Sequence, residues 1–240
     1  VVNIVTGDGA TGSALASHSD IDKIAFTGST GVGKLIAAAA AGTSKKVTLE
    51  LGGKAANIVF DDAPIDQAVE GIVNGIYFNQ GHVCCAGSRL FAQESIQAEQ
   101  LARITELVAH GVEEGADLWQ PACSMPDNGF FFAPTLLTGV AQSNRVAREE
   151  IFGPVLSVLT FRTPAEAVEK ANNTPYGLSA GIWTDKGSRI LSMVSQMRAG
   201  VVWANTFNRF DPTSPFGGYK ESGWGREGGL HGLAPYLELA

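Results

Sequence analysis

The pattern of apolar and polar positions over the first fifty residues is typical of alternating strands and helices. An apolar, β-branched run over 1–6 is broken by Gly7-Asp8-Gly9. Beyond this break the pattern predicts a short helix, a buried strand, an alanine-rich helix and a second strand, over 11–16, 23–27, 34–41 and 46–51 respectively. A strand, a glycine loop, a helix and a strand form a βαβ unit, which implies a parallel sheet.

The remainder of the chain continues the same alternation. Apolar residues at helical spacing predict a helix over 65–78, and Pro164 is suited to open another helix. Prolines and the pair Asn128-Gly129 predict a loop over 119–131. The other predicted strands are 57–60, 89–93, 155–161, 181–184 and 201–204, and the other predicted helices are 95–115, 164–172 and 186–197. The chain is therefore predicted to be an α/β protein.

Length and charge narrow the classes of protein to which the chain can belong. A chain of 240 residues can bury one large core or two modest ones. The formal net charge of −7 argues against a nucleic-acid partner, which needs clustered Lys and Arg. No apolar run reaches about eighteen residues, and Val1-Val2-Asn3 has no basic flank, so we expect no membrane span and no signal peptide. The lack of an initiator Met suggests that the start of the protein is missing.

The cysteines indicate a reducing compartment. Cys84, Cys85 and Cys123 are odd in number and two of them are adjacent, which does not suit a disulfide framework. A cytoplasmic location is therefore expected, and a working thiol would be compatible with it. The four histidines and Cys123 show no metal-ligand spacing, so no metal site is predicted.

A glycine-rich loop follows the predicted strand 23–27. The sequence Gly28-Ser29-Thr30-Gly31-Val32-Gly33 precedes a helix, so main-chain N–H groups and the helix N-terminus could hold a phosphate. The loop is neither the Gly-x-Gly-x-x-Gly dinucleotide fingerprint nor a Walker A loop, since Lys34 lacks the required spacing. Spacing alone favours a phosphate site and a purely structural turn about equally.

Two segments carry candidate chemistry. Cys84 lies among small residues in 79–89, where a thiol nucleophile could meet a substrate carbonyl. Glu50 lies between the β-branched pair Val47-Thr48 and two glycines, which suits a loop at a strand end. The separation of 34 residues allows an intervening helix to bring both to one side of a sheet. Taken singly, Glu50 also suits a solvated charge, and Cys84 suits a small core residue.

Glu50-Leu-Gly-Gly-Lys54 and Gly81-x-x-Cys84-x-Ala-Gly-Ser-Arg89 resemble the two active-site signatures of the aldehyde dehydrogenase superfamily. The resemblance implies that Cys84 attacks an aldehyde, that hydride passes to NAD or NADP, and that Glu50 activates water to hydrolyse the resulting thioester. Cys85 is then a bystander, because the family's nucleophile stands three residues before the glycine of Ala-Gly-Ser-Arg. His82 departs from the usual Gln or Glu, and a Cys84–His82 pair is not favoured, because neighbours two residues apart in a loop need not face each other.

The resemblance also implies cofactor and substrate contacts. The segment 26–30 is similar to the family's pyrophosphate-binding turn, although Gly31 replaces a larger residue. The small-molecule aldehyde is expected to be apolar or aromatic, and NAD or NADP is expected as the cofactor. The residues assigned to the cofactor are Gly28, Ser29, Gly33, Leu51, Glu150 (ribose hydroxyls) and Phe152 (nicotinamide), and those assigned to the substrate are Phe207 and Phe210.

The resemblance covers the C-terminal portion of the family. It implies an aldehyde dehydrogenase-like fold with a partial Rossmann-type cofactor domain over 1–50, a catalytic domain over 51–225 and a C-terminal segment over 226–240. The chain looks shortened after about residue 96, by about one helix and its loop. The upstream part of the family supplies the first βαβ half, an oxyanion-hole Asn and the residue that discriminates NAD from NADP. Full-length members are expected to form homo-oligomers.

Two functions remain open on these grounds. Intact Glu50 and Cys84 favour an enzyme that oxidises aldehydes to acids. The shortened pattern favours an inactive relative that serves as a binding or structural protein. For this chain alone we expect weak NAD binding and little or no aldehyde oxidation, because the adenosine end of the cofactor would lack a wall.

Overall fold

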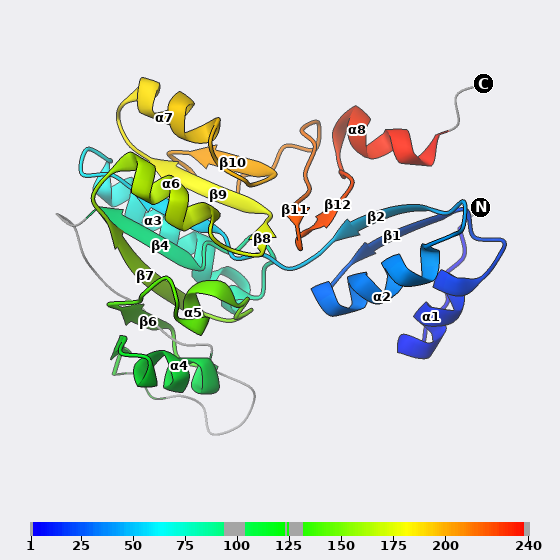
Figure 1. Ribbon diagram of the computed structural model, residues 1–240, viewed down its shortest axis with the longest axis horizontal. Coiled ribbons are helices and arrows are strands. Elements are labelled where there is room, and N and C mark those ends of the chain that lie inside the picture. The colour runs from blue at the N-terminus through cyan, green and yellow to red at the C-terminus, as the bar shows by residue number, and fades with distance from the viewer. Residues whose placement is uncertain (1, 94–103, 123, 125–131, 238–240) are drawn as a thin grey trace.

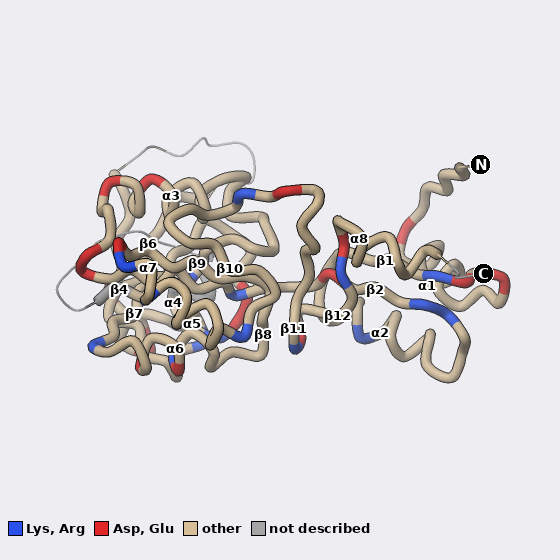
Figure 2. Tube along the Cα trace, turned by 90° about the horizontal axis from the view of Figure 1, so that it is seen from above, with Lys and Arg blue, Asp and Glu red and all other residues tan. Residues whose placement is uncertain are grey.

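The protein is built from two lobes that lie side by side (Figure 1). The computed structural model describes residues 2–93, 104–122, 124 and 132–237. Each lobe has its own sheet, and a narrow junction joins them in the view from above (Figure 2). Both ends of the described chain lie in the smaller lobe.

The smaller lobe contains the predicted βαβ unit. Strands β1 and β2 are parallel, and β12 joins the other side of β2 in the antiparallel direction. Helix α2 connects β1 to β2, which confirms the predicted order of elements. The elements of this lobe are α1 (Gly9–Ser17), β1 (Lys23–Thr27), α2 (Thr30–Ala40), β2 (Lys46–Glu50), β12 (Gly223–Trp224), α8 (Gly229–Leu233) and the 3₁₀ turn η2 (Ala234–Tyr236).

The apolar run that precedes Gly7 forms no strand over residues 2–6, and Ile4 is 86% exposed. One expectation for this lobe needs correction. Strand β1 is partly exposed rather than buried, because it lies at the edge of its sheet with only β2 beside it. Edge strands have neighbours on one side only.

The larger lobe is organised around a seven-stranded sheet. Its order is β10-β9-β3-β4-β7-β6-β5, and every neighbouring pair is parallel except β5 with β6. Central strands are buried on both faces, which explains their nearly continuous apolar runs. The strands are β3 (Ala56–Val59), β4 (Arg89–Gln93), β5 (Asp117–Trp119), β6 (Thr135–Thr138), β7 (Val155–Phe161), β9 (Ser179–Trp183) and β10 (Val201–Ala204).

Helices cover both faces of this sheet. The connection from β3 to β4 and the connection from β7 to β9 run in opposite directions across the sheet, so right-handed crossovers place α3 and α6 on opposite faces (Figure 1). The helices are α3 (Ile65–Tyr77), which the 3₁₀ turn η1 (Phe78–Gly81) extends, α4 (Ile104–Glu113), α5 (Arg145–Arg148), α6 (Pro164–Asn172) and α7 (Gly187–Val194). The predicted helix 95–115 is confirmed only for α4, since residues 94–103 are outside the described part.

Two stretches of chain cross the junction between the lobes. Residues 51–55 lead from β2 into β3, and residues 216–222 return through β11 (Tyr219–Lys220) to β12. Strand β11 pairs with β8 (Tyr176–Gly177) of the larger lobe. The C-terminal segment also contacts the smaller lobe, since Lys46 Nζ lies 3.1 Å from the Leu237 carbonyl oxygen. The domain limits at 50 and 225 stay a prediction.

Ser222 links the two lobes through hydrogen bonds at this crossing. Its side chain is fully buried. The hydroxyl donates to the Gly52 carbonyl oxygen at 2.6 Å and accepts from the Gly177 N–H at 3.0 Å. Because Gly52 lies two residues after the end of β2, these bonds fix the end of β2, and with it Glu50, relative to the larger lobe.

Candidate active site

Glu50 and Cys84 lie near each other at the junction, but on different sheets. Glu50 ends β2 of the smaller lobe, whereas Cys84 precedes β4 of the larger lobe. The Cys84 charge is one of the influences on the Glu50 carboxyl, which shows that the two groups are neighbours. The expectation that a helix would bring both to one side of a single sheet is therefore wrong. The chain crosses between lobes directly after Glu50, and this crossing brings the two residues together.

Two glycines allow the Glu50 segment to pass close to its neighbours. A Cβ atom on Gly53 would overlap the Cys84 carbonyl oxygen, and one on Gly52 would overlap the Glu150 carboxylate. The Gly53 N–H donates to Glu150 Oε1 at 2.9 Å. The close approach of the main chains thus requires glycine at position 53, whereas a side chain at position 52 would displace the Glu150 carboxylate.

The carboxyl group of Glu50 is buried and strongly perturbed. The side chain is 3% exposed, and neither carboxylate oxygen has a hydrogen-bond partner within the described residues. The pKa of this carboxyl is raised to about 8, chiefly by burial and also by the charges of Glu227 and Cys84, while the charge of Arg226 opposes the rise. A carboxyl group with a pKa near the working pH is suited to accept and release a proton.

Cys84 is the more exposed of the two adjacent thiols and has the lower pKa. It is partly exposed, whereas Cys85 is 1% exposed. The Cys85 thiol donates to Cys84, which lowers the pKa of Cys84 to about 7 against the effect of burial, and nearby main-chain N–H groups assist. The pKa of Cys85 is raised, because its proton is held by Cys84 and the group is buried. Cys85 Sγ also lies 3.4 Å from Asn208 Oδ1.

A limiting amount of iodoacetamide is expected to alkylate Cys84 before Cys85. The thiolate is the reacting species, so the alkylation rate of Cys84 should rise with a midpoint near pH 7. Peptide mass spectrometry of the folded protein would locate the adduct and give the rate at each pH. Cys84→Ser serves as the control that should lose the fast phase. First labelling of Cys85, or of Cys123 outside the described residues, would contradict the assignment.

The predicted phosphate turn lies at the N-terminus of α2. Strand β1 ends at Thr27 and α2 begins at Thr30, with Ser29 as its N-cap. Ser29 Oγ accepts from the Val32 N–H at 3.3 Å, and the other first-turn N–H groups are the donors that an anion would use. The Gly28 N–H donates to the Glu50 carbonyl oxygen at 3.0 Å, so the turn is tied to the end of β2.

Gly33 and Leu51 complete the packing under this turn. Both are buried, and a Cβ atom on Gly33 would overlap the Leu51 side chain. The two residues therefore set how closely α2 approaches the end of β2. Gly33 and Leu51 were expected to contact the cofactor. In the structure they pack against each other beneath the turn.

Glu150 and Phe152 reach the same region from the larger lobe. The Glu150 carboxylate contacts Gly52 and Gly53, and its charge acts on Cys84. Phe152 has a left-handed backbone, with φ of 58°, and is 50% exposed. The structure thus brings Glu150 and Cys84 together and leaves the Phe152 ring accessible beside the cysteine loop.

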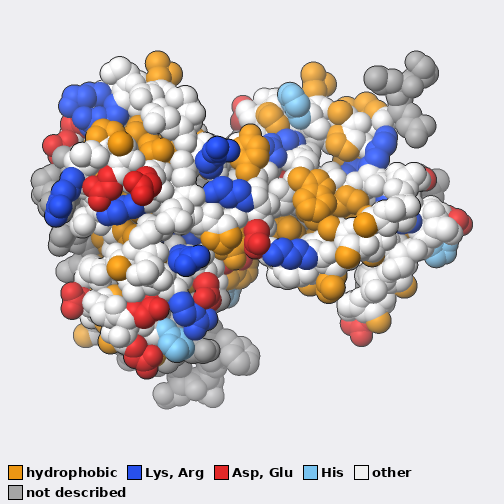
Figure 3. Space-filling view, viewed as in Figure 1, with side chains coloured by type: hydrophobic (Ala, Val, Ile, Leu, Met, Phe, Trp, Pro, Cys, Tyr) orange, Lys and Arg blue, Asp and Glu red, His pale blue; other side chains and the backbone are white. Residues whose placement is uncertain are grey.

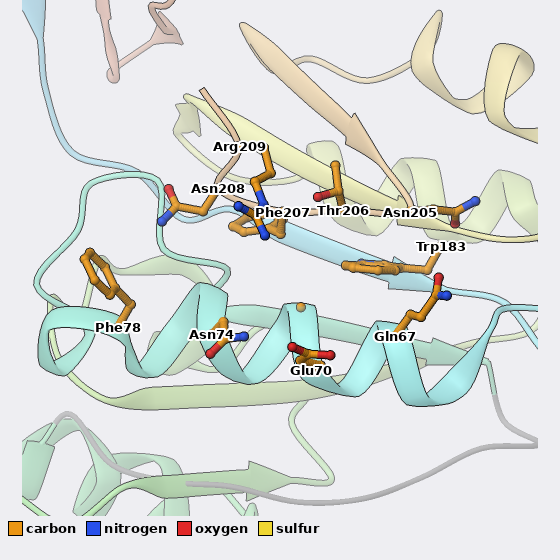
Figure 4. A pocket seen from close by; sticks show the side chains of 11 residues that line it. Gln67, Glu70, Asn74, Phe78, Trp183, Asn205, Thr206, Phe207, Asn208 and Arg209 are labelled. Carbon is orange, nitrogen blue, oxygen red and sulfur yellow. The ribbon is translucent and has the colours of Figure 1, made fainter. Parts of the chain in front are cut away.

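A cavity of about 440 Å³ lies between α3 and the segment 205–209 (Figure 4). Phe207 lines it but is 6% exposed and packs against Trp203, while Phe210 packs against Trp203 and Phe216 outside the lining. Sequence reasoning missed the α3 side of the cavity, although its residues recur at helical spacing. The lining residues are Gln67, Glu70, Gly71, Asn74, Phe78, Trp183, Asn205, Thr206, Phe207, Asn208 and Arg209.

Arg226 and Glu227 were also missed from sequence. Both act electrostatically on Glu50. The Arg226 guanidinium donates to the Gly218 and Gly225 carbonyl oxygens at 3.0 and 2.6 Å. A sequence signal exists, since the two charges follow Gly223 and Gly225, which allow close backbone approach, but such glycines also occur in ordinary turns.

Three further features of the described residues are the distribution of surface charge, the length of the helices and the grouping of potential metal ligands. Figure 3 shows acidic and basic side chains interspersed over the visible face of the larger lobe. None of the described helices combines the length and the apolar composition that a membrane crossing needs. Among the described residues, no three His, Cys, Asp or Glu side chains are grouped as metal ligands would be.

Comparison with known proteins identifies the family. The model of the aldehyde dehydrogenase family matches residues 1–108 and 95–240, so the chain belongs to that family. It is 45% identical to human (Homo sapiens) retinal dehydrogenase 2 over 272 residues, covering all of this chain and 52% of that protein. It is 43% identical to cytosolic aldehyde dehydrogenase 1 of Rattus norvegicus, again covering all of this chain and 54% of the relative. The chain spans about half the length of these relatives.

Solved structures confirm the fold. The NAD-dependent aldehyde dehydrogenase of Sinorhizobium meliloti superposes with a TM-score of 0.89 at 39% identity, over 96% of this chain and 52% of that one. The aldehyde dehydrogenase of Bacillus cereus, solved as an NAD⁺ complex, gives 0.89 at 38% identity, over 97% and 54%. The predicted aldehyde dehydrogenase-like α/β fold is therefore confirmed.

Proposed function

We propose that this protein takes part in the NAD-dependent oxidation of an aldehyde to a carboxylic acid, through a thiohemiacetal and a thioester on Cys84. One observation carries the proposal: a thiol with a pKa of about 7 lies next to a buried carboxyl group with a pKa of about 8. The family membership and the relatives' names support the reaction class.

Cys84 would act as the nucleophile. Its thiolate attacks the aldehyde carbon, a C–S bond forms, and the carbonyl oxygen takes the electron pair. The Cys85 thiol and nearby main-chain N–H groups hold the thiolate before the attack. Collapse of the oxyanion with loss of hydride leaves a thioester on Cys84.

The residues around the α2 turn fit a dinucleotide. First-turn N–H groups of α2 and the Ser29 hydroxyl offer donors to a pyrophosphate, Glu150 offers oxygens to ribose hydroxyls, and the half-exposed Phe152 ring offers a face to the nicotinamide. NAD, when bound, supplies the hydride acceptor. We favour NAD because the Sinorhizobium meliloti relative is NAD-dependent and the Bacillus cereus relative was solved as an NAD⁺ complex, and NADP is the alternative.

Glu50 would act as the general base in the second half of the reaction. Its carboxylate takes a proton from water, the water oxygen attacks the thioester carbon, and the C–S bond breaks to release the acid and the Cys84 thiolate. Both carboxylate oxygens of Glu50 are free of hydrogen bonds within the described residues, so either can accept this proton.

Hydrolysis of 4-nitrophenyl acetate tests these roles without the cofactor. The ester acylates Cys84 to the same kind of thioester, so we expect a burst of nitrophenol followed by steady turnover. Glu50→Gln should keep the burst and lower the steady rate by about 10²–10⁴-fold. Since the base must be deprotonated, the steady rate of the unchanged protein should rise with pH through about 8.

Two controls make the ester assay decisive. Cys84→Ala should lose the burst, whereas Cys85→Ala should keep a burst that is slower at neutral pH, because Cys84 loses the hydrogen bond that lowers its pKa. A burst that survives Cys84→Ala would overturn the nucleophile assignment. No burst from the unchanged protein would favour the inactive binding or structural relative instead.

We further infer a cytosolic setting and a chain shortened near residue 96, and we expect homo-oligomers only of the full-length family members. A thiol of low pKa needs a reducing compartment, and one relative is named cytosolic. The family model matches two stretches of the chain, which overlap between residues 95 and 108. The alignment with human retinal dehydrogenase 2 covers 272 positions, which is 32 more than the 240 residues of this chain. Both facts support the shortening.

A further inference from the structure

His82 stacks on Phe152 rather than serving Cys84. The two ring centroids are 5.3 Å apart and the rings are nearly parallel, at 14°. His82 is exposed and lies two residues before Cys84, while Phe152 comes from the segment after α5. The stack therefore joins the cysteine loop to the segment that carries Glu150.

Phe152 needs an external support for its conformation. Its φ of 58° lies in the left-handed region, which a bulky side chain rarely adopts. Such a conformation persists when surrounding contacts hold it. At 50% exposure, Phe152 lacks the enclosing core that would supply such contacts.

The loop that presents His82 is well fixed. Asn79, Gln80 and Gly81 all have positive φ, at 50°, 58° and 73°. The His82 N–H donates to the Asn79 carbonyl oxygen at 3.0 Å, and Asn79 Nδ2 donates to the His82 carbonyl oxygen at 3.1 Å. The imidazole thus projects from a backbone that is hydrogen-bonded on both sides.

A second contact joins the same two segments directly beside the stack. A Cβ atom on Gly81 would overlap the Gly153 carbonyl group, so the two main chains touch. The pair Gly81–Gly153 sets the spacing of the segments, and the pair His82–Phe152 sets the orientation of the exposed ring.

We propose that His82 is a positioning residue that holds the Phe152 ring in place at the cofactor side of Cys84. The proposal rests on the proposed function insofar as Phe152 receives the nicotinamide. It gives a role to His82, which stands where the resembled family usually has Gln or Glu. An aromatic ring at position 82 offers Phe152 a stacking face, which an aliphatic amide or acid lacks.

Native-state proteolysis tests the positioning role. Chymotrypsin would be added to the folded protein, and cleavage of the Phe152–Gly153 bond would be followed by mass spectrometry. His82→Ala and His82→Gln should raise this rate by roughly three- to tenfold, the change expected for loss of one aromatic pair. His82→Phe keeps a stacking ring and should restore the original rate, and His231→Ala, on an exposed helix, should leave it unchanged.

Unchanged cleavage at Phe152 in His82→Ala and His82→Gln would overturn the proposal, as would a rise that His82→Phe fails to reverse. A parallel titration with NAD separates this result from the proposed function. NAD should protect the Phe152–Gly153 bond, and His82→Ala should shift the protecting concentration upward by a similar factor. Protection that is absent from every variant, beside the expected change in cleavage, would refute the nicotinamide role of Phe152 and leave the positioning role standing.

Discussion

Replacing Glu50 by glutamine is expected to remove most of the pH dependence of the free energy of unfolding between pH 5 and pH 7.5. In the folded protein the pKa of Glu50 is about 8, against an ordinary value of 4.5. Across this window the folded protein keeps the Glu50 proton, whereas the unfolded chain releases it. Stability contributed by the proton is therefore present at low pH and is lost as the pH rises.

The expected loss is large. At about 1.4 kcal/mol per pH unit, the Glu50 carboxyl alone should make the unchanged protein about 3 kcal/mol less stable at pH 7.5 than at pH 5. Asp62 and Glu166 have pKa values below their ordinary range, so their titrations fall below this window. Cys84, whose pKa is lowered to about 7, acts in the opposite direction and should add somewhat less than about 1 kcal/mol of stability by pH 7.5. Glutamine has no proton to release, so the variant should lose the decline and keep only this small rise.

Urea unfolding at pH 5 and pH 7.5 measures this effect. Glu169→Gln is the matched control, because Glu169 is exposed and its replacement should leave the pH dependence of the unchanged protein. If Glu50→Gln and Glu169→Gln showed the same slope, the carboxyl of Glu50 would be ionised in the folded protein at neutral pH, and its proposed role as a base with a raised pKa would be wrong.

Local sequence patterns were sufficient to predict the ends of a strand or helix when the signals for those ends lie within the element or beside it. The strand 155–161 and the helix 164–172 are confirmed at both ends. The first is buried on both sides, which gives a continuous apolar run, and the second begins at Pro164 after Thr163, whose hydroxyl accepts from the Glu166 N–H at 3.2 Å. Signals of this kind are contained in a few neighbouring residues.

The arrangement of the site could not be read in the same way. Glu50 and Cys84 were identified from their segments, but their meeting depends on two sheets and on a crossing fastened by Ser222, which is 170 residues from Gly52 in sequence. No local pattern predicts which distant main chain will accept such a bond. The cavity beside α3 could not be predicted for a related reason. Its other wall is formed by residues 205–209, which are far from α3 in the sequence.

Glycines illustrate the difference between recognising a motif and explaining it. Gly52 and Gly53 could be quoted from sequence as part of a signature, but the reason for them is steric. One faces the Glu150 carboxylate and the other faces the Cys84 carbonyl oxygen. The two glycines of the signature lie where the segments that carry Glu50, Cys84 and Glu150 approach one another closely. Only the folded structure shows which atoms leave no room for a side chain there.

Arg89→Met is expected to be the most damaging single substitution around the site. Arg89 is 2% exposed, and its three hydrogen bonds go to main-chain carbonyl oxygens, at 2.8 Å to Lys54, 3.3 Å to Lys170 and 2.9 Å to Ala171. Burial lowers the pKa of Arg89 to about 9, so it remains protonated at neutral pH. Methionine fills a similar space but leaves these buried acceptors unpaired, at a cost of about 3 kcal/mol or more.

The damage should extend to the thiols, because Arg89 joins three parts of the structure. It stands five residues after Cys84, it binds the end of the Glu50–Lys54 segment, and it binds the carbonyl end of α6. Without this link the cysteine loop should loosen, Cys85 should become open to alkylation, and the pKa of Cys84 should move up toward its ordinary value of 9. Urea unfolding and the pH profile of alkylation measure the two effects separately.

Arg89→Lys and Arg148→Met complete the test. Lysine keeps the positive charge but cannot reach three separate carbonyls with a planar fork, so its effects on stability and on Cys84 should be intermediate. Arg148 is exposed on α5, and its replacement should change stability by less than about 0.5 kcal/mol. If Arg89→Met lowered stability while Cys84 kept its alkylation midpoint and Cys85 stayed protected, Arg89 would support the fold without holding the cysteine loop. A shift of the Cys84 midpoint in Arg89→Lys, at a stability near that of the unchanged protein, would instead tie the reactivity of the thiol directly to this one buried guanidinium.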